Sequence, residues 1–124
     1  MVQKEVANRI IAKKSTKEYG ILTVMIGAFF DVEYLFTVPP SVFYPKPKVY
    51  SAVIRLNRNT NKYIVSDYKK FLQVVKAAFN KRRKTLRNAL KDLYGLDNVP
   101  SEFLNKRAEE LDIKEFITLS ELVI

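Results

Sequence analysis

Two residue types with versatile chemistry are missing from this sequence, which contains no cysteine and no histidine. Their absence excludes disulfides, thiolate nucleophiles, imidazole bases and the usual zinc ligand sets. Glycine is scarce: only Gly20, Gly27 and Gly95 occur, so no Gly-x-Gly loop is present to hold a phosphate or a dinucleotide. Asp31 and Glu33 alternate along a predicted strand, and we expect them to face solvent rather than to form a paired-carboxylate site. The chain therefore shows no evident chemical machinery of its own.

Long hydrophobic runs are also missing. The most apolar stretch, residues 20–30, is about half as long as a membrane-spanning helix must be, and the first residues lack a signal-peptide pattern. We therefore expect a soluble, intracellular protein. Its 124 residues, 48% of them hydrophobic, suffice for one domain or for a small domain with a subdomain.

Positive charge is abundant and uneven, with a net charge of +9 and a pI near 9.8. Residues 79–91, called the basic run below, contain no acid. Its six cations are Lys81, Arg82, Arg83, Lys84, Arg87 and Lys91. Because like charges repel, a polyanionic partner explains this density better than a solvated helix face, which remains the alternative. Nucleic acid is the first candidate; lipid headgroups are a weaker one, since no long apolar face accompanies the charge.

The first half of the chain predicts two helices and two strands. Apolar residues at helical spacing predict a short helix over residues 3–12, and the apolar stretch 20–30 predicts a buried helix in which Gly27 permits close packing. Residues 31–38 and 49–56 are rich in β-branched and aromatic side chains and predict two strands. Since a two-stranded sheet is marginal in water, we expect that part of the sheet is missing upstream.

The second half predicts helices only. Polar residues 57–62 indicate a linker, after which Ser66 or Asp67 is a candidate N-cap for an amphipathic helix that meets the basic run. Its apolar stripe comprises Tyr68, Phe71, Leu72, Val75, Ala78 and Phe79, continued by Leu86, Ala89, Leu90 and Leu93. Further helices are predicted to begin near residue 101 and to cover residues 113–122. The layout is a small α/β part followed by an all-helical part.

A stiff loop separates the two predicted strands. Pro45 and Pro47 restrict the backbone of the loop, and Lys46 and Lys48 flank them. Phe43 therefore stands on a rigid, cationic turn, from which an aromatic ring can be presented to a flat ligand. The alternative is that Phe43 is a core aromatic beside a proline-rich turn.

Four segments in the same order resemble the KsgA-type ribosomal RNA adenine dimethyltransferases, a family that includes the Erm methylases. They are Met-Val-Gln-Lys-Glu-Val-Ala at residues 1–7, Tyr-Gly-Ile-Leu-Thr-Val at 19–24, Val-Pro-Pro-Ser-Val-Phe-Tyr-Pro-Lys-Pro-Lys-Val at 38–49, and Arg-Arg-Lys-Thr-Leu-Arg-Asn-Ala-Leu at 82–90. The resemblance covers nearly the whole chain but only the second half of the family. The family's glycine-rich methyl-donor loop and its Asn-[Leu/Ile]-Pro-Tyr motif do not occur here.

The resemblance implies the C-terminal part of a Rossmann-like methyltransferase domain in residues 1–57, a linker in 58–65 and a small helical rRNA-docking domain in 66–124. It implies that Phe43 stacks on an extruded adenine, in a loop supported by Pro45, Pro47 and Ser51. The sequence departs from the family at Tyr50, where a short polar residue is common, and at Thr23, where serine is usual.

The implied function is S-adenosylmethionine-dependent dimethylation of adenines in small-subunit (16S) rRNA during ribosome biogenesis, in the cytoplasm. We expect the basic run to bind the phosphates of rRNA, free or in a 30S precursor. We expect the chain alone to bind no methyl donor and to have no methyltransferase activity. Self-association through an exposed sheet edge, or a rearrangement of the first 57 residues, is also expected. The alternatives are a non-catalytic RNA- or DNA-binding helical module, including a helix-turn-helix variant disfavoured by the lack of a tight turn, and a structural fragment with a solvated basic surface.

Overall fold

The computed structural model describes residues 1–59 and 62–124 and contains one three-stranded antiparallel sheet. Strand β3 (Ser51–Arg58) lies in the middle, with β2 (Phe30–Val38) on one side and the two-residue β1 (Val2–Gln3) on the other. The two predicted strands are confirmed to within two residues at each end. Strand β1 was not predicted, because two residues carry no readable period and only pairing with β3 defines them.

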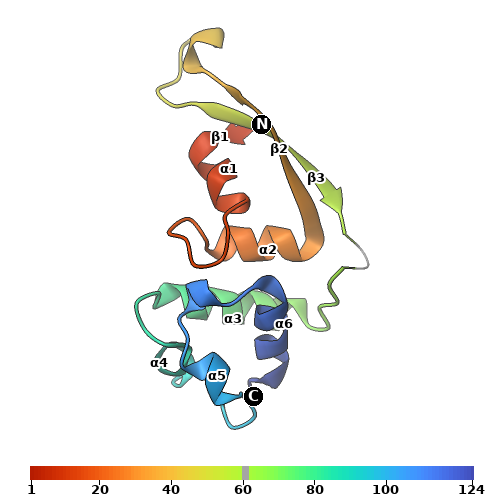
Figure 1. Cartoon of the computed structure of the whole chain (residues 1–124), viewed down its shortest axis with the longest axis vertical. Helices are drawn as coiled ribbons and strands as arrows, with labels where there is room; N and C mark the ends of the chain where they lie inside the picture. Colours follow the sequence, from red (N-terminus) through yellow and green to blue (C-terminus); the bar gives the residue numbers. More distant parts are fainter. Residues whose placement is uncertain (60–61) are drawn as a thin grey trace.

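Helices α1 (Lys4–Ile10) and α2 (Ile21–Phe29) follow the prediction closely. Helix α2 lies between the sheet and the later helices (Figure 1). A Cβ atom on Gly27 would come within 2.5 Å of Ile113 Cδ1, so the expected close packing at this glycine is confirmed. The α/β part thus meets the helical part through α2.

The second half folds into α3 (Tyr68–Asn80), α4 (Leu86–Leu90), α5 (Ser101–Leu104), the 3₁₀ turn η2 (Ala108–Glu110) and α6 (Ile113–Leu122). Of the two candidate N-caps, Asp67 is the one used, because its Oδ1 accepts a hydrogen bond from the Lys70 amide at 3.1 Å. The apolar stripe ends earlier than predicted: Leu86, Ala89 and Leu90 are buried, but Leu93 follows the end of α4 and is exposed.

One hydrophobic core spans both halves. Val24 and Ala28 of α2 belong to the same buried cluster as Phe71 of α3 and Phe116 of α6. Tyr19 is buried among them, and its hydroxyl donates a 2.6 Å hydrogen bond to the Leu111 carbonyl. Burial, aided by the negative charges of Asp112 and Glu115, raises the pKa of Tyr19 well above its ordinary value.

The predicted start of the linker is wrong. Asn57 and Arg58 belong to β3, and Asn59 is buried, with Nδ2 donating to the Gly27 carbonyl at 3.2 Å. Polar composition suggested a loop here, but an antiparallel sheet with one solvated face accepts polar side chains in its strands, and the last residues of β3 are exposed. Residues 60–61 of the predicted linker lie outside the described part of the chain.

Within residues 1–59 and 62–124, no helix combines the length and the apolar character needed to cross a bilayer.

Candidate nucleic-acid interface

The proline-rich loop projects from the end of the sheet between β2 and β3 (Figure 1). It begins with the 3₁₀ turn η1 (Pro40–Val42), which Phe43 ends by donating its amide to the Pro40 carbonyl at 3.2 Å. Phe43 is half-buried, whereas the next residue, Tyr44, is fully exposed. A cis peptide bond joins Tyr44 to Pro45. Phe43 is therefore neither a core residue nor a free ring at the loop tip, and one part of its surface remains accessible.

The loop is anchored where it enters β3. Ser51 is paired with Val38 of β2 on one side and with Gln3 of β1 on the other. The preceding carbonyl, that of Tyr50, accepts a 2.9 Å hydrogen bond from the Lys4 amide. Pro47 is half-buried and Pro45 is exposed. The base of the loop is thus held by main-chain bonds on both sides.

The sequence suggested that the basic run continues as a helix, but the structure divides it between a turn and a short helix. Helix α3 ends at Asn80, and residues 81–85 form a turn before α4 begins at Leu86. The Lys84 amide donates to the Lys81 carbonyl within this turn, and Thr85 forms a β-bridge with Arg107. The sequence showed no tight turn between two helices, and a helix-turn-helix variant was disfavoured for that reason; the structure does have such a turn, between α3 and α4. It arises because the chain turns back to meet residues 106–107, a tertiary contact with no local signal.

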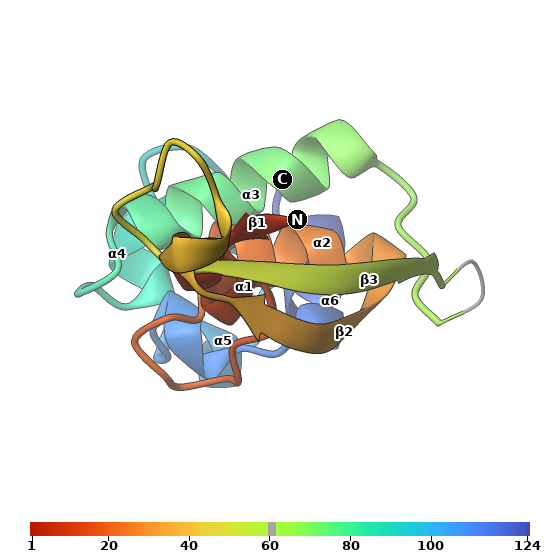
Figure 2. The same ribbon diagram turned by 90° about the horizontal axis from the view of Figure 1, so that it is seen from above.

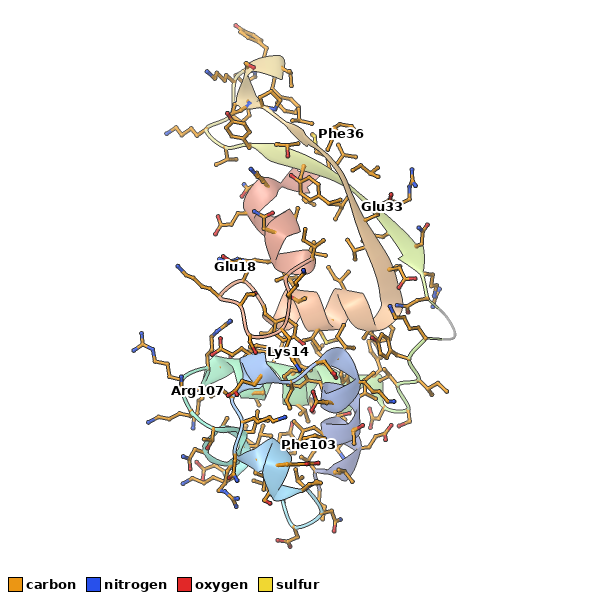
Figure 3. The ribbon with its side chains drawn as sticks, in the orientation of Figure 1. Lys14, Glu18, Glu33, Phe36, Phe103 and Arg107 are labelled. Atoms are coloured by element: carbon orange, nitrogen blue, oxygen red, sulfur yellow. The ribbon has the colours of Figure 1, made fainter. Side chains whose placement is uncertain are left out.

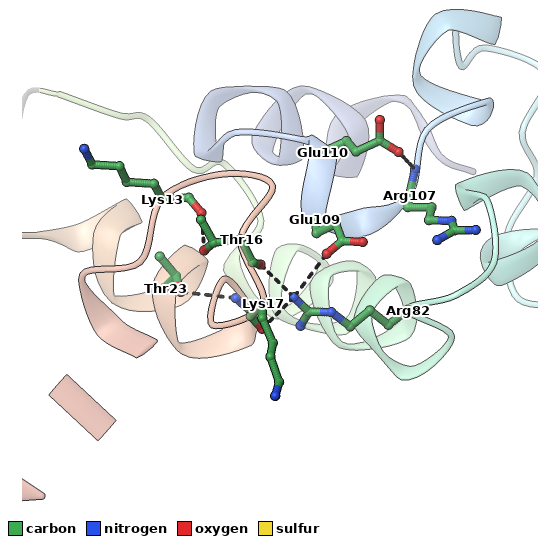
Figure 4. Close-up of polar contacts among 9 residues, drawn as sticks. Lys13, Thr16, Lys17, Thr23, Arg82, Arg107, Glu109 and Glu110 are labelled. Atoms are coloured by element: carbon green, nitrogen blue, oxygen red, sulfur yellow. Dashed lines mark hydrogen bonds and ion pairs between the residues drawn. The ribbon is translucent and has the colours of Figure 1, made fainter. Parts of the chain in front are cut away.

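Arg82 differs from its neighbours because its guanidinium is engaged in the fold (Figure 4). Its Nη2 lies 3.1 Å from the Thr16 carbonyl, 2.9 Å from the Lys17 carbonyl and 3.4 Å from Glu109 Oε2. Its Cζ lies 5.7 Å from the centre of the Phe79 ring. Arg82 therefore ties the loop between α1 and α2 to the helical half.

The cations of the basic run surround a hollow with a volume of about 750 Å³. Its basic lining residues are Lys81, Arg82, Arg83, Lys84 and Lys91. Asp92 is the one acid in the lining, which Asn80 and Asn88 complete. Arg87 is outside this lining, and its Nη2 lies 3.5 Å from Asn105 Oδ1. The structure thus brings five of the six predicted cations together and leaves Arg87 apart.

A second hollow, here called the cleft, has a volume of about 890 Å³ and was not anticipated from the sequence. Its walls include Lys4 and Arg9 of α1, Lys17 of the following loop, and Tyr50 at the base of the proline loop. Arg82 lines both the cleft and the basic hollow, so the two are neighbours. These residues come from distant segments, and no sequence pattern brought them together; Tyr50 had been noted as a departure from the family, without a role.

Seen along the long axis, the proline loop and α4 project on the same side and the segment leading into α3 on the other (Figure 2), although the loop and α4 lie toward opposite ends of that axis (Figure 1). Phe43 lines neither of the two hollows. Across the described residues, no group of acids is arranged to hold a metal ion. The arrangement is suited to binding a polyanion along one side, with aromatic rings available near the loop.

Comparison with known proteins identifies close relatives. The family model "Ribosomal RNA adenine dimethylase" matches residues 1–123. The chain is 54% identical to the ribosomal RNA small subunit methyltransferase A of Bacteroides thetaiotaomicron, over 99% of this chain and 47% of that protein. It is 52% identical to the protein of the same name from Cytophaga hutchinsonii, over 99% of this chain and 48% of that protein. The chain thus spans about half the length of these curated relatives.

Solved structures share the fold. A dimethyladenosine transferase from Plasmodium falciparum superposes with a TM-score of 0.79 at 22% identity, covering 98% of this chain and 56% of that one. The 23S rRNA methyltransferase ErmE gives a TM-score of 0.61 at 24% identity, covering 98% of this chain and 52% of that one. At such identities the likeness concerns the fold alone. Since the family model spans residues 1–123, the chain belongs to the ribosomal RNA adenine dimethylase family.

Proposed function

We propose that this chain is the C-terminal portion of an S-adenosylmethionine-dependent enzyme that dimethylates adenines of small-subunit (16S) rRNA during ribosome biogenesis in the cytoplasm. The observation that carries the proposal is the identity of about half of all positions, along the whole chain, with proteins named ribosomal RNA small subunit methyltransferase A. These relatives are about twice as long, which leaves room for a methyl-donor domain outside the present residues.

In this proposal, residues 1–57 complete the catalytic domain and residues 66–124 form a helical domain that docks on rRNA. Residues 58–65 are the linker between the two. Among the described residues, 1–59 and 62–124, the three strands lie before residue 59 and the elements after it are helices with a single β-bridge, which supports this division. The shared core across α2, α3 and α6 supports a fixed orientation of the two parts. A docking surface held rigidly beside a substrate loop positions the target base without a further conformational search.

Phe43 is proposed to stack on the target adenine. Stacking of a base on an aromatic side chain is worth about 1–3 kcal/mol and gains from a ring held in place beforehand. The main-chain pairing of Ser51 and the restricted backbone at Pro45 and Pro47 supply this rigidity. No nucleophilic side chain is needed, because such a reaction depends on positioning the amine beside the methyl donor.

The donor itself does not fit the residues of this chain. None of the glycines Gly20, Gly27 and Gly95 has a positive φ, and Gly27 lies inside a helix, so they form no glycine-rich cradle for S-adenosylmethionine. We therefore expect the isolated chain to transfer no methyl groups to small-subunit particles. Dimethylation by the purified chain would contradict this part of the proposal.

The phosphate contacts are assigned to Lys81, Arg83, Lys84 and Lys91, which are exposed around one hollow. Arg82 contributes to the same positive surface while it holds the fold, and Arg87 is a peripheral contact. If four phosphates are neutralised, log K falls with log salt at a slope of about −3.6.

The test is the salt dependence of binding to a small-subunit rRNA helix. The variant Arg83→Glu/Lys84→Glu should weaken binding and flatten the slope, since both side chains lie in the basic hollow. The matched control is Lys69→Glu/Lys114→Glu, which changes the net charge equally. Lys69 lies in the first turn of α3 and Lys114 in the first turn of α6, and neither lines the basic hollow.

Equal loss of affinity in both double variants would indicate a general charge effect rather than a docking surface. Unchanged affinity in Arg83→Glu/Lys84→Glu would favour a purely structural basic run.

A non-catalytic nucleic-acid-binding module is the second candidate, and the turn between α3 and α4 favours keeping it. Against it, α4 has only five residues, a short helix for reading a major groove. Competition decides between the two: a DNA duplex that displaces structured rRNA at equal concentration would support the module.

Self-association of the isolated chain is also proposed. Strand β2 is at the edge of the three-stranded sheet, and Leu35 and Phe36 on it are exposed. Figure 3 labels Phe36. An apolar edge strand with free main-chain groups favours pairing with a second copy.

A further inference from the structure

The cleft beside the proline loop has the size and lining of a nucleotide site. Its volume of about 890 Å³ is within the range of small-ligand pockets. Tyr50 is one of its lining residues and is 52% exposed, and Lys4 Nζ lies 5.9 Å from the centre of the Tyr50 ring. Apolar contributions from Ile21 and Phe79 complete a partly hydrophobic lining. An aromatic ring kept accessible within a concave site is suited to receive a flat partner.

The charges in the cleft favour an anion. The Arg9 guanidinium is paired with Glu5 at 3.0 Å, and Arg82 is held by backbone carbonyls and Glu109. Two further lining cations remain, Lys4 and Lys17, against one further acid, Glu18, which Figure 3 labels. The amino-terminal end of α2 also lines the cleft at Gly20, Ile21 and Leu22, and its partial positive charge adds to the same field.

The cleft adjoins both regions that are proposed to contact RNA, the proline loop and the basic hollow. Tyr50 directly precedes Ser51, where the loop bearing Phe43 is anchored. Arg82 lines the cleft and the basic hollow alike. A single strand that leaves the basic hollow can therefore pass through the cleft on its way to the proline loop.

We propose that the cleft is a second nucleotide subsite, in which a base of single-stranded RNA stacks on Tyr50 while Lys4 and Lys17 contact the adjoining phosphates. The identification of the ligand as RNA rests on the proposed function, in which RNA is the partner. The subsite itself rests on the cleft and is distinct from the ring of Phe43 and from the basic hollow. Its role is to hold a nucleotide that neighbours the target, and so to set the path of the strand.

The experiment uses the whole chain and a hepta-adenylate RNA, with an abasic oligoribonucleotide of equal charge as the matched probe. Tyr50→Ala should bind hepta-adenylate about 5- to 150-fold more weakly, the range that corresponds to the loss of one stacked base, with the salt slope unchanged. Tyr50→Phe should bind within about two-fold of the wild type, because the ring remains. The abasic probe should bind wild type and Tyr50→Ala alike.

Fluorescence gives a second readout, because the chain contains no tryptophan. In Tyr50→Trp, hepta-adenylate should quench the emission and the abasic probe should not. The control is Ile64→Trp: Ile64 is 81% exposed, does not line the cleft, and lies before α3, whose 13 residues extend about 20 Å toward Phe79 and Arg82. Its emission should not respond to either probe.

The outcomes separate the two proposals. If Tyr50→Ala binds like the wild type while Arg83→Glu/Lys84→Glu loses affinity, the subsite is refuted and the docking surface stands. Equal quenching of Tyr50→Trp by the abasic probe would also overturn stacking. If the wild-type chain binds neither hepta-adenylate nor the rRNA helix, both proposals fall.

Discussion

Replacing Arg82 should destabilise the protein far more than replacing its neighbour Arg83, although both belong to the same basic run. Arg82 Nη2 contacts the carbonyls of Thr16 and Lys17, which belong to the loop between α1 and α2. A hydrogen bond from a charged donor contributes about 1.5–3 kcal/mol. Because one Nη carries two hydrogens, and because the Arg82 side chain is 35% exposed and partly screened by water, we expect about 2 kcal/mol in total for Arg82→Met.

The assay is urea denaturation followed by circular dichroism. Arg82→Met should lower the midpoint by about 1 M, whereas Arg83→Met, which alters an exposed side chain, should change the free energy of unfolding by no more than about 0.5 kcal/mol. Glu109→Gln removes the 3.4 Å ion pair but leaves both carbonyl contacts, so its effect should be smaller than that of Arg82→Met. Equal midpoints for the Arg82 and Arg83 variants would refute the assignment of Arg82 to the fold.

This difference decides how RNA binding is tested. A double reversal that included Arg82→Glu would place a carboxylate beside Glu109 and opposite two carbonyl oxygens. Loss of binding would then report unfolding as much as a lost phosphate contact. The pair Arg83→Glu/Lys84→Glu avoids this ambiguity.

Three further predictions concern stability and association. Because burial raises the pKa of Tyr19, the unfolded chain loses this proton first above about pH 10, and the free energy of unfolding should fall there by about 1.4 kcal/mol per pH unit. Tyr19→Phe should lessen that fall in pH-dependent urea titrations; an unchanged profile would contradict it. Asp112→Ala should cost about 1 kcal/mol by the same assay, since Asp112 Oδ1 accepts the Glu115 amide at 2.8 Å at the start of α6, while exposed Asp97→Ala should have little effect. Phe36→Lys should reduce self-association in sedimentation at high concentration, and a wild-type chain that is already monomeric there would refute edge pairing.

Local patterns predicted the elements well where each pattern was long enough to have a period. The helix that begins after Asp67 and the strands around the proline loop are read from composition and spacing within one segment. The two-residue β1 and the turn at residues 81–85 were missed, because each is formed by contacts with a distant segment. Four ordered sequence blocks identified the family, since they preserve residue identity as well as period.

The sequence by itself determined the longer helices and the two long strands, the uneven positive charge, the stiff loop that carries Phe43 and the family to which the chain belongs. Only the tertiary structure decided the role of each cation. Packing turned Arg82 inward against the loop before α2, gathered Lys81, Arg83, Lys84 and Lys91 around one hollow, and set Tyr50 in a cleft. The physical reason is that charge and aromaticity are properties of a residue, whereas exposure and partners depend on segments that are distant in the chain and meet only in the fold.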